Sequence, residues 1–218
     1  MKFKFGVVLF ILLLMQGAVQ AQLPFWNEIR AFKIQDSLKP VDQGQTVFTG
    51  SSTIRLWKTL DKDFPGFTII NRGFGGSTLP DLIQYVDQVV IRYHPMQVVI
   101  YCGENDLAAD STINGKTVFK RFKSLQDIIH GILPQCNIVF ISLKPSPSRA
   151  HLYTKVVDAN RRIKKFIKKK SYLAYVDIVP PMLDAQGKPR EELFLADRLH
   201  MNEKGYAIWK TVLAPYLK

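Results

Sequence analysis

The chain has 218 residues, of which 47% are hydrophobic and 22% are charged, and its 30 basic and 18 acidic side chains give a formal net charge of +12. This length suits one globular domain, since domains run to about 100–200 residues, and the apolar content argues against a disordered chain. Thirteen glycines and two cysteines exclude a collagen-like chain and a disulfide scaffold.

The first 21 residues have the pattern of a secretory signal peptide. Lys2 and Lys4 precede a short apolar run, Val7–Met15, and the segment ends at the small residue Ala21. That order is typical of export signals, and the run is shorter than the ~20 apolar residues that span a bilayer. We expect cleavage near Ala21 and a secreted or periplasmic protein without stable membrane insertion. The alternative is an uncleaved membrane anchor.

The mature chain is expected to begin with a helix and a linker, residues 22–45, packed on a single domain formed by residues 46–218. Within residues 24–37, the apolar side chains fall on one side of a helix. They are Phe25, Trp26, Ile29 and Phe32.

Five short apolar runs alternate with amphipathic segments from residue 46 onward. Such runs are typical of strands that a parallel sheet buries on both faces. The predicted strands are Thr46–Thr49, Phe67–Asn71, Gln97–Cys102, Asn137–Leu143 and Leu173–Asp177.

The segments between the strands predict helices, because their apolar residues recur at helical spacing. They are Leu79–Val90, Val118–Ile132, Arg149–Lys170 and a last helix that Asn202 caps. Alternation of strands and helices predicts a three-layer, doubly wound α/β fold with a five-stranded parallel sheet of order 2-1-3-4-5. Functional groups are then expected at the carboxyl ends of the strands.

The two cysteines fall at opposite ends of neighbouring predicted strands. Cys102 ends the third strand and Cys136 precedes the fourth. A disulfide needs Cα atoms within about 7 Å, so we expect two free, buried thiols. No Cys/His cluster has the spacing of metal ligands, and we expect neither a metal nor a cofactor.

A serine-rich turn follows the first strand, Gly50-Ser51-Ser52-Thr53. A Ser at a strand-to-helix turn is exposed, and its own backbone N–H lies at a helix N-terminus, where developing negative charge is stabilised. The alternative is that one of these hydroxyls only caps the helix.

The second and third strands end in further short motifs. Asn71 to Gly76 contains three glycines that allow close approach of the backbone to a ligand, or that form an ordinary turn. Its spacing does not match a dinucleotide-binding fingerprint. Gly103 to Asp106 contains Asn105, whose amide can point into the same cleft, although Asn is also a common loop residue.

The fourth motif, Asp197-Arg198-Leu199-His200, stands just before the last predicted helix. The Asp can fix the tautomer of the His, whose other ring nitrogen can accept a proton from a Ser hydroxyl. The alternative is a surface His with an incidental acidic neighbour.

Together the four motifs are more specific than any one alone. Ser52, Gly76 and Asn105 end three strands that are adjacent in the predicted order, and Asp197 and His200 must return to the same edge. The set supplies a nucleophile, a base, an orienting acid and oxyanion donors.

On these motifs the chain resembles the SGNH (GDSL-type) hydrolase family, esterases and lipases of flavodoxin-like fold, over roughly residues 46–217. The resemblance implies a Ser52, Asp197 and His200 triad, and an oxyanion hole formed by Ser52, Gly76 and Asn105. The chain departs from the pattern of the family it resembles at two positions: Ser51 stands where the family has Asp, and Arg198 stands where Gly is common.

The resulting hypothesis is a serine esterase that hydrolyses short acyl esters, acetyl groups on carbohydrate-like substrates, through an acyl-enzyme. We expect Arg72, Asp106 and Arg198, which stand in or beside the motifs, to contact this substrate. The partner is then a small-molecule or glycan ester, with no nucleic acid, and the oligomeric state stays open.

Three alternatives remain. One is a lysophospholipase-like lipid acylhydrolase, and another is a non-catalytic binding module. The third is a binder of nucleic acid or an anionic surface, suggested by a basic run on the polar side of one predicted helix. That run comprises Arg161, Arg162, Lys164, Lys165, Lys168, Lys169 and Lys170.

Overall fold

The computed structural model describes residues 23–218, so the predicted signal peptide lies outside the described residues. A five-stranded parallel sheet forms the middle layer, with the strand order β2-β1-β3-β4-β5. This order confirms the predicted doubly wound fold. The strands are β1 (Thr46–Gly50), β2 (Ile69–Gly73), β3 (Gln97–Tyr101), β4 (Asn137–Ile141) and β5 (Leu173–Val176).

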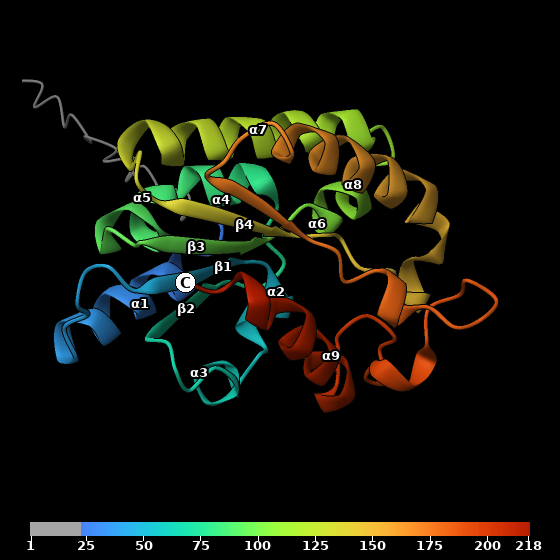
Figure 1. Ribbon diagram of the computed structural model, residues 1–218, viewed down its shortest axis with the longest axis horizontal. Coiled ribbons are helices and arrows are strands. Elements are labelled where there is room, and N and C mark those ends of the chain that lie inside the picture. The colour runs from blue at the N-terminus through green and yellow to red at the C-terminus, as the bar shows by residue number, and fades with distance from the viewer. Residues whose placement is uncertain (1–22) are drawn as a thin grey trace, which may run out of the picture.

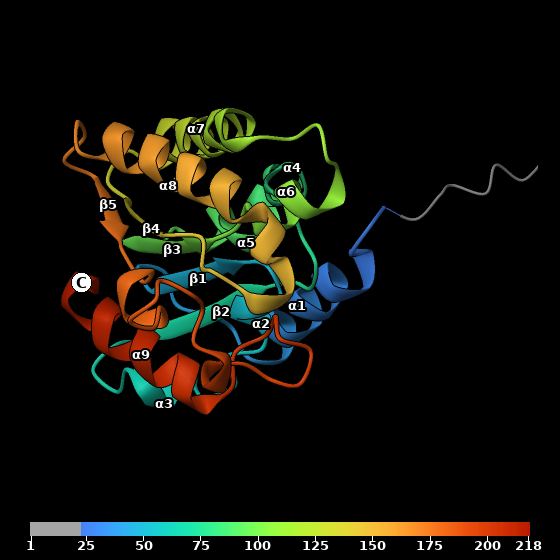
Figure 2. The ribbon, with the colours of Figure 1, turned by 90° about the vertical axis from the view of Figure 1, so that its right-hand side faces the viewer.

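Helices cover both faces of this sheet (Figure 1). The turned view shows the same layers end-on, with α1 (Trp26–Leu38) beside the sheet (Figure 2). The helices on one face are α4 (Leu79–Gln84), α5 (Val86–Val89), α7 (Gly115–Ile132) and α8 (Tyr153–Ile167). Those on the other face are α3 (Leu60–Asp63) and α9 (Glu203–Leu213).

Short elements join the layers. Two of them, α2 (Ser52–Arg55) and α6 (Glu104–Ala109), follow the carboxyl ends of β1 and β3. The others are 3₁₀ helices: η1 (Ile91–Tyr93), η2 (Pro147–Leu152), η3 (Pro180–Met182), η4 (Glu191–Leu193) and η5 (Ala214–Tyr216).

Strand position in the sheet explains the apolar runs. Every residue of the central strands β1 and β3 is buried, whereas the edge strands β2 and β5 each carry partly exposed residues. Helix caps follow local chemistry as well. Thr78 and Asp81 form a capping box on α4, and Asn202 accepts the backbone N–H groups of Lys204 and Gly205 at the start of α9.

Two predicted helices differ from the structure. The helix predicted over residues 79–90 is interrupted at Tyr85, whose hydroxyl donates to the carbonyl oxygen of Pro24 at 2.6 Å and whose ring packs on Phe74. The segment predicted as a helix from Arg149 begins as η2, with Arg149 itself outside helical geometry (φ −116°, ψ 24°). In both places tertiary contacts outweigh the helical pattern.

Both cysteines are free and buried, as predicted. Within residues 23–218, no helix is long and apolar enough to cross a membrane.

Candidate active site

The turn after β1 presents Ser52 at the carboxyl edge of the sheet. Gly50 ends the strand with a φ of 129°, and a β-carbon there would lie 1.9 Å from the carbonyl oxygen of Tyr101. Ser51 precedes the helix in extended geometry, and Ser52 is the first residue of α2. Its backbone N–H therefore has no partner within that helix. The turn leaves the Ser52 side chain half-buried, at the edge where β1 lies between β2 and β3.

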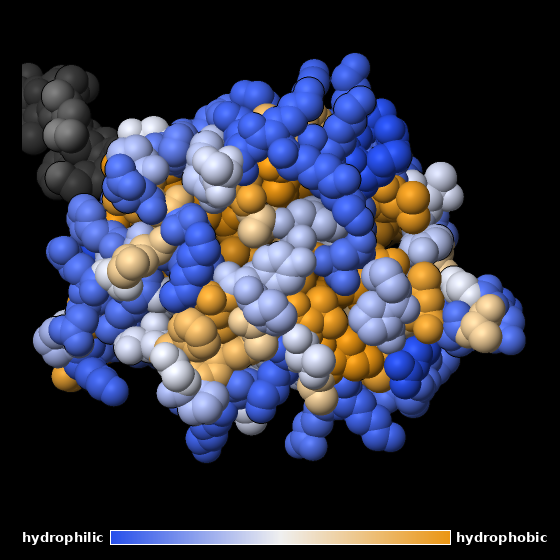
Figure 3. Space-filling view, viewed as in Figure 1, coloured by the Kyte–Doolittle hydropathy of each residue, from blue (hydrophilic) through white to orange (hydrophobic). Residues whose placement is uncertain are grey.

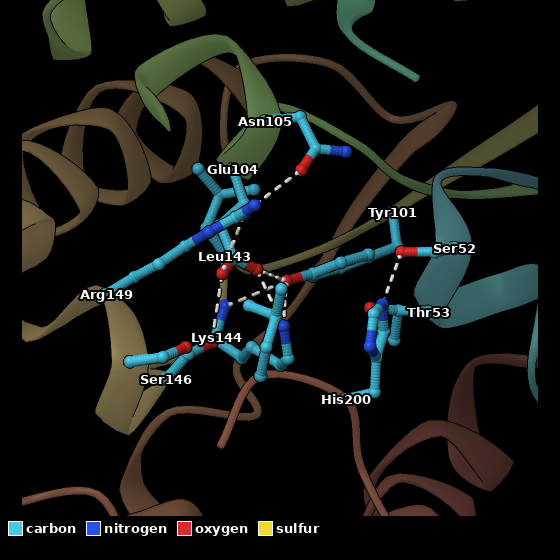
Figure 4. A network of polar contacts seen from close by, with 12 residues as sticks. Ser52, Thr53, Tyr101, Glu104, Asn105, Leu143, Lys144, Ser146, Arg149 and His200 are labelled. Atoms are coloured by element: carbon cyan, nitrogen blue, oxygen red, sulfur yellow. Dashed lines mark hydrogen bonds and ion pairs between the residues drawn. The ribbon is translucent and has the colours of Figure 1, made fainter. Parts of the chain in front are cut away.

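Three side chains form a continuous hydrogen-bonded chain at this edge. Ser52 Oγ lies 2.9 Å from His200 Nε2, and His200 Nδ1 lies 2.6 Å from Asp197 Oδ2. Figure 4 shows the His200 ring pointing at Ser52. This arrangement can move a proton from the hydroxyl to the ring while the carboxylate stabilises the charged imidazole.

The Asp197 carboxylate is held in its ionised form. Partial burial opposes ionisation, but the backbone N–H groups of Leu199 and His200 and the His200 ring outweigh it and lower the pKa of Asp197 to about 2. The second carboxylate oxygen thus stays free to orient the ring. The group needed to fix the His200 tautomer is ionised at any pH above about 4.

The loop that carries Asp197 and His200 is closed by backbone bonds. Leu195 N–H donates to the carbonyl oxygen of His200 at 2.8 Å, and Arg198 N–H donates to that of Leu195 at 2.9 Å. Arg198 has a φ of 56°, in the left-handed region that favours glycine. A glycine at this position would adopt the same conformation at a lower cost.

Two further N–H donors follow the carboxyl ends of the neighbouring strands β2 and β3. Gly76 has a φ of 75°, and among the described residues its backbone N–H has no hydrogen-bond partner. The Asn105 amide donates one N–H to the carbonyl oxygen of Ser77 at 3.0 Å. Because the register pairs Gly50 with both Gly73 and Tyr101, these strand ends lie side by side.

A buried polar network lies next to Asn105 and contacts it through Arg149 (Figure 4). Glu104 is 4% exposed, and its carboxylate accepts from Lys144 Nζ at 2.7 Å, from Ser146 Oγ at 2.9 Å and from the Tyr101 hydroxyl at 2.5 Å. Arg149 Nη1 lies 3.2 Å from the same carboxylate. The network joins the ends of β3 and β4.

Charges compensate within this network. Burial opposes ionisation of Glu104, but the charges of Lys144 and Arg149 outweigh it and lower the pKa of the carboxyl. Burial also lowers the pKa of Lys144, more than the Glu104 charge raises it. Arg149 follows the fourth predicted strand and was expected to line the cleft, whereas Lys144 was not identified, although a lysine directly after a buried strand was an available signal.

Comparison with known proteins decides the family. The model of the GDSL-like Lipase/Acylhydrolase family matches residues 43–208, which is most of the chain. The chain belongs to this family. It is accordingly a hydrolase of ester bonds. No curated protein gives a significant match to it.

Solved structures of the same fold include three that illustrate the range of this acylhydrolase family. A candidate acylhydrolase from Bacteroides fragilis is 21% identical, with a TM-score of 0.76 over 88% of this chain and 96% of that one. A GDSL-like lipase from Bacteroides thetaiotaomicron is 21% identical, with a TM-score of 0.74 over 86% and 96%. An acetyl-xylooligosaccharide esterase variant from Geobacillus is 16% identical, with a TM-score of 0.62 over 80% and 94%.

Two residues expected to contact substrate are structural in this GDSL-like hydrolase. Arg72 is buried, and its guanidinium is bound by Asp36 and by the Tyr93 hydroxyl at 2.6 Å, on the side facing α1. Asp106 is 1% exposed and accepts from Leu79 N–H at 2.9 Å and from Arg121 at 2.7 Å. Their side chains are engaged in the fold, so the structure gives no support to the predicted substrate-binding role of either.

Arg198 is engaged as well, but at the surface. Its Nε donates to Glu191 at 3.0 Å, and both side chains are more than half exposed. The ion pair draws the guanidinium toward η4. Its backbone matters more directly, because the carbonyl oxygen of Arg198 accepts both the N–H and the hydroxyl of Ser148 at 3.0 Å.

The N-terminal helix of this GDSL-like hydrolase also reaches the site, which the sequence analysis did not predict. Both carboxylate oxygens of Glu28 accept the Gly75 N–H, at 3.1 and 3.2 Å. The ring of Phe25 packs edge-on against Phe74 in the same turn. Residues before the matched range therefore hold the peptide next to Gly76.

Cavities and possible ligands complete the description. A cavity of about 170 Å³ borders Glu104 and Arg149 and is otherwise lined largely by apolar groups such as Pro145 and Val156. A larger groove lies between α1, α3 and β2, and neither Ser52 nor His200 lines the cavity or the groove. Among residues 23–218, no group of three or more His, Cys, Asp or Glu side chains could hold a metal ion.

Proposed function

We propose that this acylhydrolase cleaves short-acyl carboxylic esters, acetyl groups on carbohydrate-like molecules, through an acyl-enzyme on Ser52. The observation that carries the proposal is the hydrogen-bonded chain from Ser52 through His200 to Asp197 at the carboxyl edge of the sheet. No step in this chemistry needs a metal or a cofactor.

In the first half of the reaction, His200 Nε2 takes the proton of Ser52 as Oγ attacks the ester carbonyl carbon. The carbonyl π electrons move to its oxygen, and a tetrahedral intermediate forms. The intermediate then collapses, and His200 gives the same proton to the departing alcohol. In the second half, water attacks the acyl-enzyme by the same route and releases the acid and Ser52.

The negative oxygen of each intermediate needs donors. The backbone N–H groups of Ser52 and Gly76 and the Asn105 side chain serve here as the oxyanion hole. The Ser52 N–H is available because α2 begins at Ser52, so this N–H has no partner within the helix. The Gly76 N–H has no partner among the described residues, and the Asn105 amide keeps a second N–H besides the one bonded to Ser77. Removing one such donor typically lowers kcat by roughly 10²–10³-fold.

The substrate class is supported by one structural neighbour and by the predicted location of the protein. The structural neighbour from Geobacillus is described as an acetyl-xylooligosaccharide esterase, which supports acetylated sugars as the class to test first. The predicted signal peptide supports a secreted or periplasmic location, where such a glycan would be met.

The test compares residues 22–218 with the Ser52→Ala and Asp197→Asn variants on p-nitrophenyl acetate, butyrate and octanoate. We expect the wild type to prefer acetate and Ser52→Ala to fall to the blank rate. Asp197→Asn should lower kcat by roughly 10²–10⁴-fold, because the His200 tautomer is no longer fixed. Initial rates under saturating substrate measure both effects.

A matched control is Ser124→Ala, which removes an exposed hydroxyl on α7 and should leave the rate unchanged. If the enzyme prefers octanoate, the proposed substrate class becomes a lipid ester instead of a carbohydrate ester. Equal activity of wild type and Ser52→Ala, on folded protein, would overturn the serine mechanism itself.

A further inference from the structure

The side-chain amide of Asn105 has an oxygen and an NH₂ group, and only the NH₂ group can donate a hydrogen bond to an oxyanion. Its Nδ2 donates to the carbonyl oxygen of Ser77 at 3.0 Å, and its Oδ1 accepts from Arg149 Nη2 at 3.0 Å. A flipped amide would set Oδ1 against the Ser77 oxygen and the amide N–H groups against the guanidinium. Both contacts would be repulsive, so the two partners together specify which end faces the cleft.

Arg149 is itself held at both ends of its guanidinium. Nη1 contacts the Glu104 carboxylate at 3.2 Å while Nη2 contacts Asn105, and Figure 4 shows the side chain lying between these two residues. The remaining acceptor capacity of Glu104 is filled by Lys144 and its neighbours. Because Glu104 is buried and fully bonded, it gives Arg149 a fixed anchor.

Arg149 stands at a kink between two helical turns, and its guanidinium lies beside the Asn105 oxygen. Arg149 leaves helical geometry inside η2, at φ −116° and ψ 24°. The positive charge of the guanidinium polarises the Asn105 amide through this contact.

We propose that Arg149 is a positioning residue of the oxyanion hole. It fixes the Asn105 amide with Nδ2 toward the substrate carbonyl oxygen, and its charge strengthens that N–H as a donor. This inference rests on the proposed function, since it concerns the same reaction. It assigns Arg149 a role in kcat that acts through Asn105 and makes no contact with the substrate.

The first experiment measures kcat and KM for Arg149→Ala, Asn105→Ala and the double variant. Loss of a hydrogen bond from a charged group predicts a roughly 10- to 100-fold fall in kcat for Arg149→Ala, with KM nearly unchanged. Guanidinium chloride at millimolar concentration should restore part of that loss. Arg161→Ala, which removes an exposed cation on α8, is the matched control.

The double variant separates positioning from a general structural effect. If Arg149 acts through Asn105, Arg149→Ala should change kcat little once Asn105 is already Ala. Independent losses would instead multiply. A multiplicative result, or an Arg149→Ala enzyme with wild-type kcat, overturns the inference, as does a rise in KM alone.

A second measurement does not depend on turnover. The side-chain NH₂ resonances of Asn105 in a ¹⁵N spectrum, assigned by their loss in Asn105→Ala, should shift or broaden in Arg149→Ala and not in Arg161→Ala. Unmoved resonances would contradict the positioning role even if the esterase function stands. Conversely, a Ser52→Ala enzyme with full activity would reject the proposed function and leave the NMR result to decide the Asn105 contact.

Discussion

Two glycines at the site are required for different physical reasons. At Gly50 there is no room, because a β-carbon would lie 1.9 Å from the carbonyl oxygen of Tyr101. At Gly76 there is room, since an added β-carbon would meet only the Phe25 ring, at 4.0 Å. What Gly76 supplies is its φ of 75°, which other residues adopt at a cost.

We therefore expect Gly50→Ala to lower the melting temperature much more than Gly76→Ala does. Gly76→Ala keeps its N–H and should lose only about 1–2 kcal/mol of stability, a fall in melting temperature of roughly 2–8 °C. Gly50→Ala should fail to fold or melt more than ~10 °C lower. Thermal unfolding followed by circular dichroism measures both, and similar melting temperatures for the two variants would show that the space at Gly50 is not what matters.

At the same scale, the sequence allowed the placement of the hydroxyl, imidazole and carboxylate groups to be predicted. Ser52 lies at the end of a central strand, and such positions follow from the strand order alone. The burial of Arg72 and Asp106 was not predicted, because closeness to a motif along the chain does not show where a side chain points. The partners of Arg149 lie 44 and 45 residues away in sequence, and no local pattern connects them.

Among the elements, α1 has a role that its place in the chain does not suggest. It precedes the matched range of residues 43–208, yet Glu28 accepts the Gly75 N–H with both carboxylate oxygens. Ile29 of the same helix is fully buried. The helix thus fixes the peptide adjoining the Gly76 donor from outside the sheet.

Glu28→Ala is expected to lower kcat about fivefold, because one hydrogen bond contributes ~1 kcal/mol to the position of that peptide. The melting temperature should fall only slightly. Steady-state kinetics on p-nitrophenyl acetate measures the change, with the exposed Arg30→Ala on the same helix as control. A Glu28→Ala enzyme as active as Arg30→Ala would mean that α1 stabilises the fold without tuning the site.

Element boundaries were predictable where local chemistry decides them. The start of α9 at Asn202 follows from its capping side chain. The break at Tyr85 and the kink at Arg149 depend instead on Pro24 and Glu104, which are distant in the chain. Helical periodicity cannot report such contacts, and it therefore predicted continuous helices in both places.

At the level of the whole molecule, the reactivity of the two buried thiols measures whether both ends of the sheet unfold together. Burial raises the pKa of Cys102 well above its ordinary value and raises that of Cys136 to about 12. Cys102 follows β3 and Cys136 precedes β4, so they lie at opposite ends of the sheet. Neither can reach the other, and neither is exposed.

Both thiols should therefore be unreactive toward a disulfide reagent at pH 8 in the folded protein. The thiolate fraction of Cys136 is about 1000-fold below that of an ordinary cysteine. Two equivalents should react together on addition of denaturant, which absorbance of the released thiol measures. Reaction of one thiol well before the other would show that one end of the sheet opens on its own.

A run of basic residues lies on α8 and directly after it. Hydrophilic side chains dominate the rim over α7 and α8 (Figure 3). Within the basic run, Arg161 and Arg162 pair with Asp158, and Lys164 pairs with Asp177. These two carboxylates offset part of the positive charge, and the prediction that nucleic acid is not a partner remains untested.

The last residue of the chain is tied to the beginning of β3. Lys218 N–H donates to Gln97 Oε1 at 3.3 Å, and Gln97 Nε2 donates to the carbonyl oxygen of Tyr216 at 2.8 Å. Gln97 opens its strand, whereas Ser52 and His200 meet at the far edge, where strands finish. An enzyme fixed to a bead or fused to another domain through Lys218 would therefore turn its catalytic edge outward, toward a polymeric substrate.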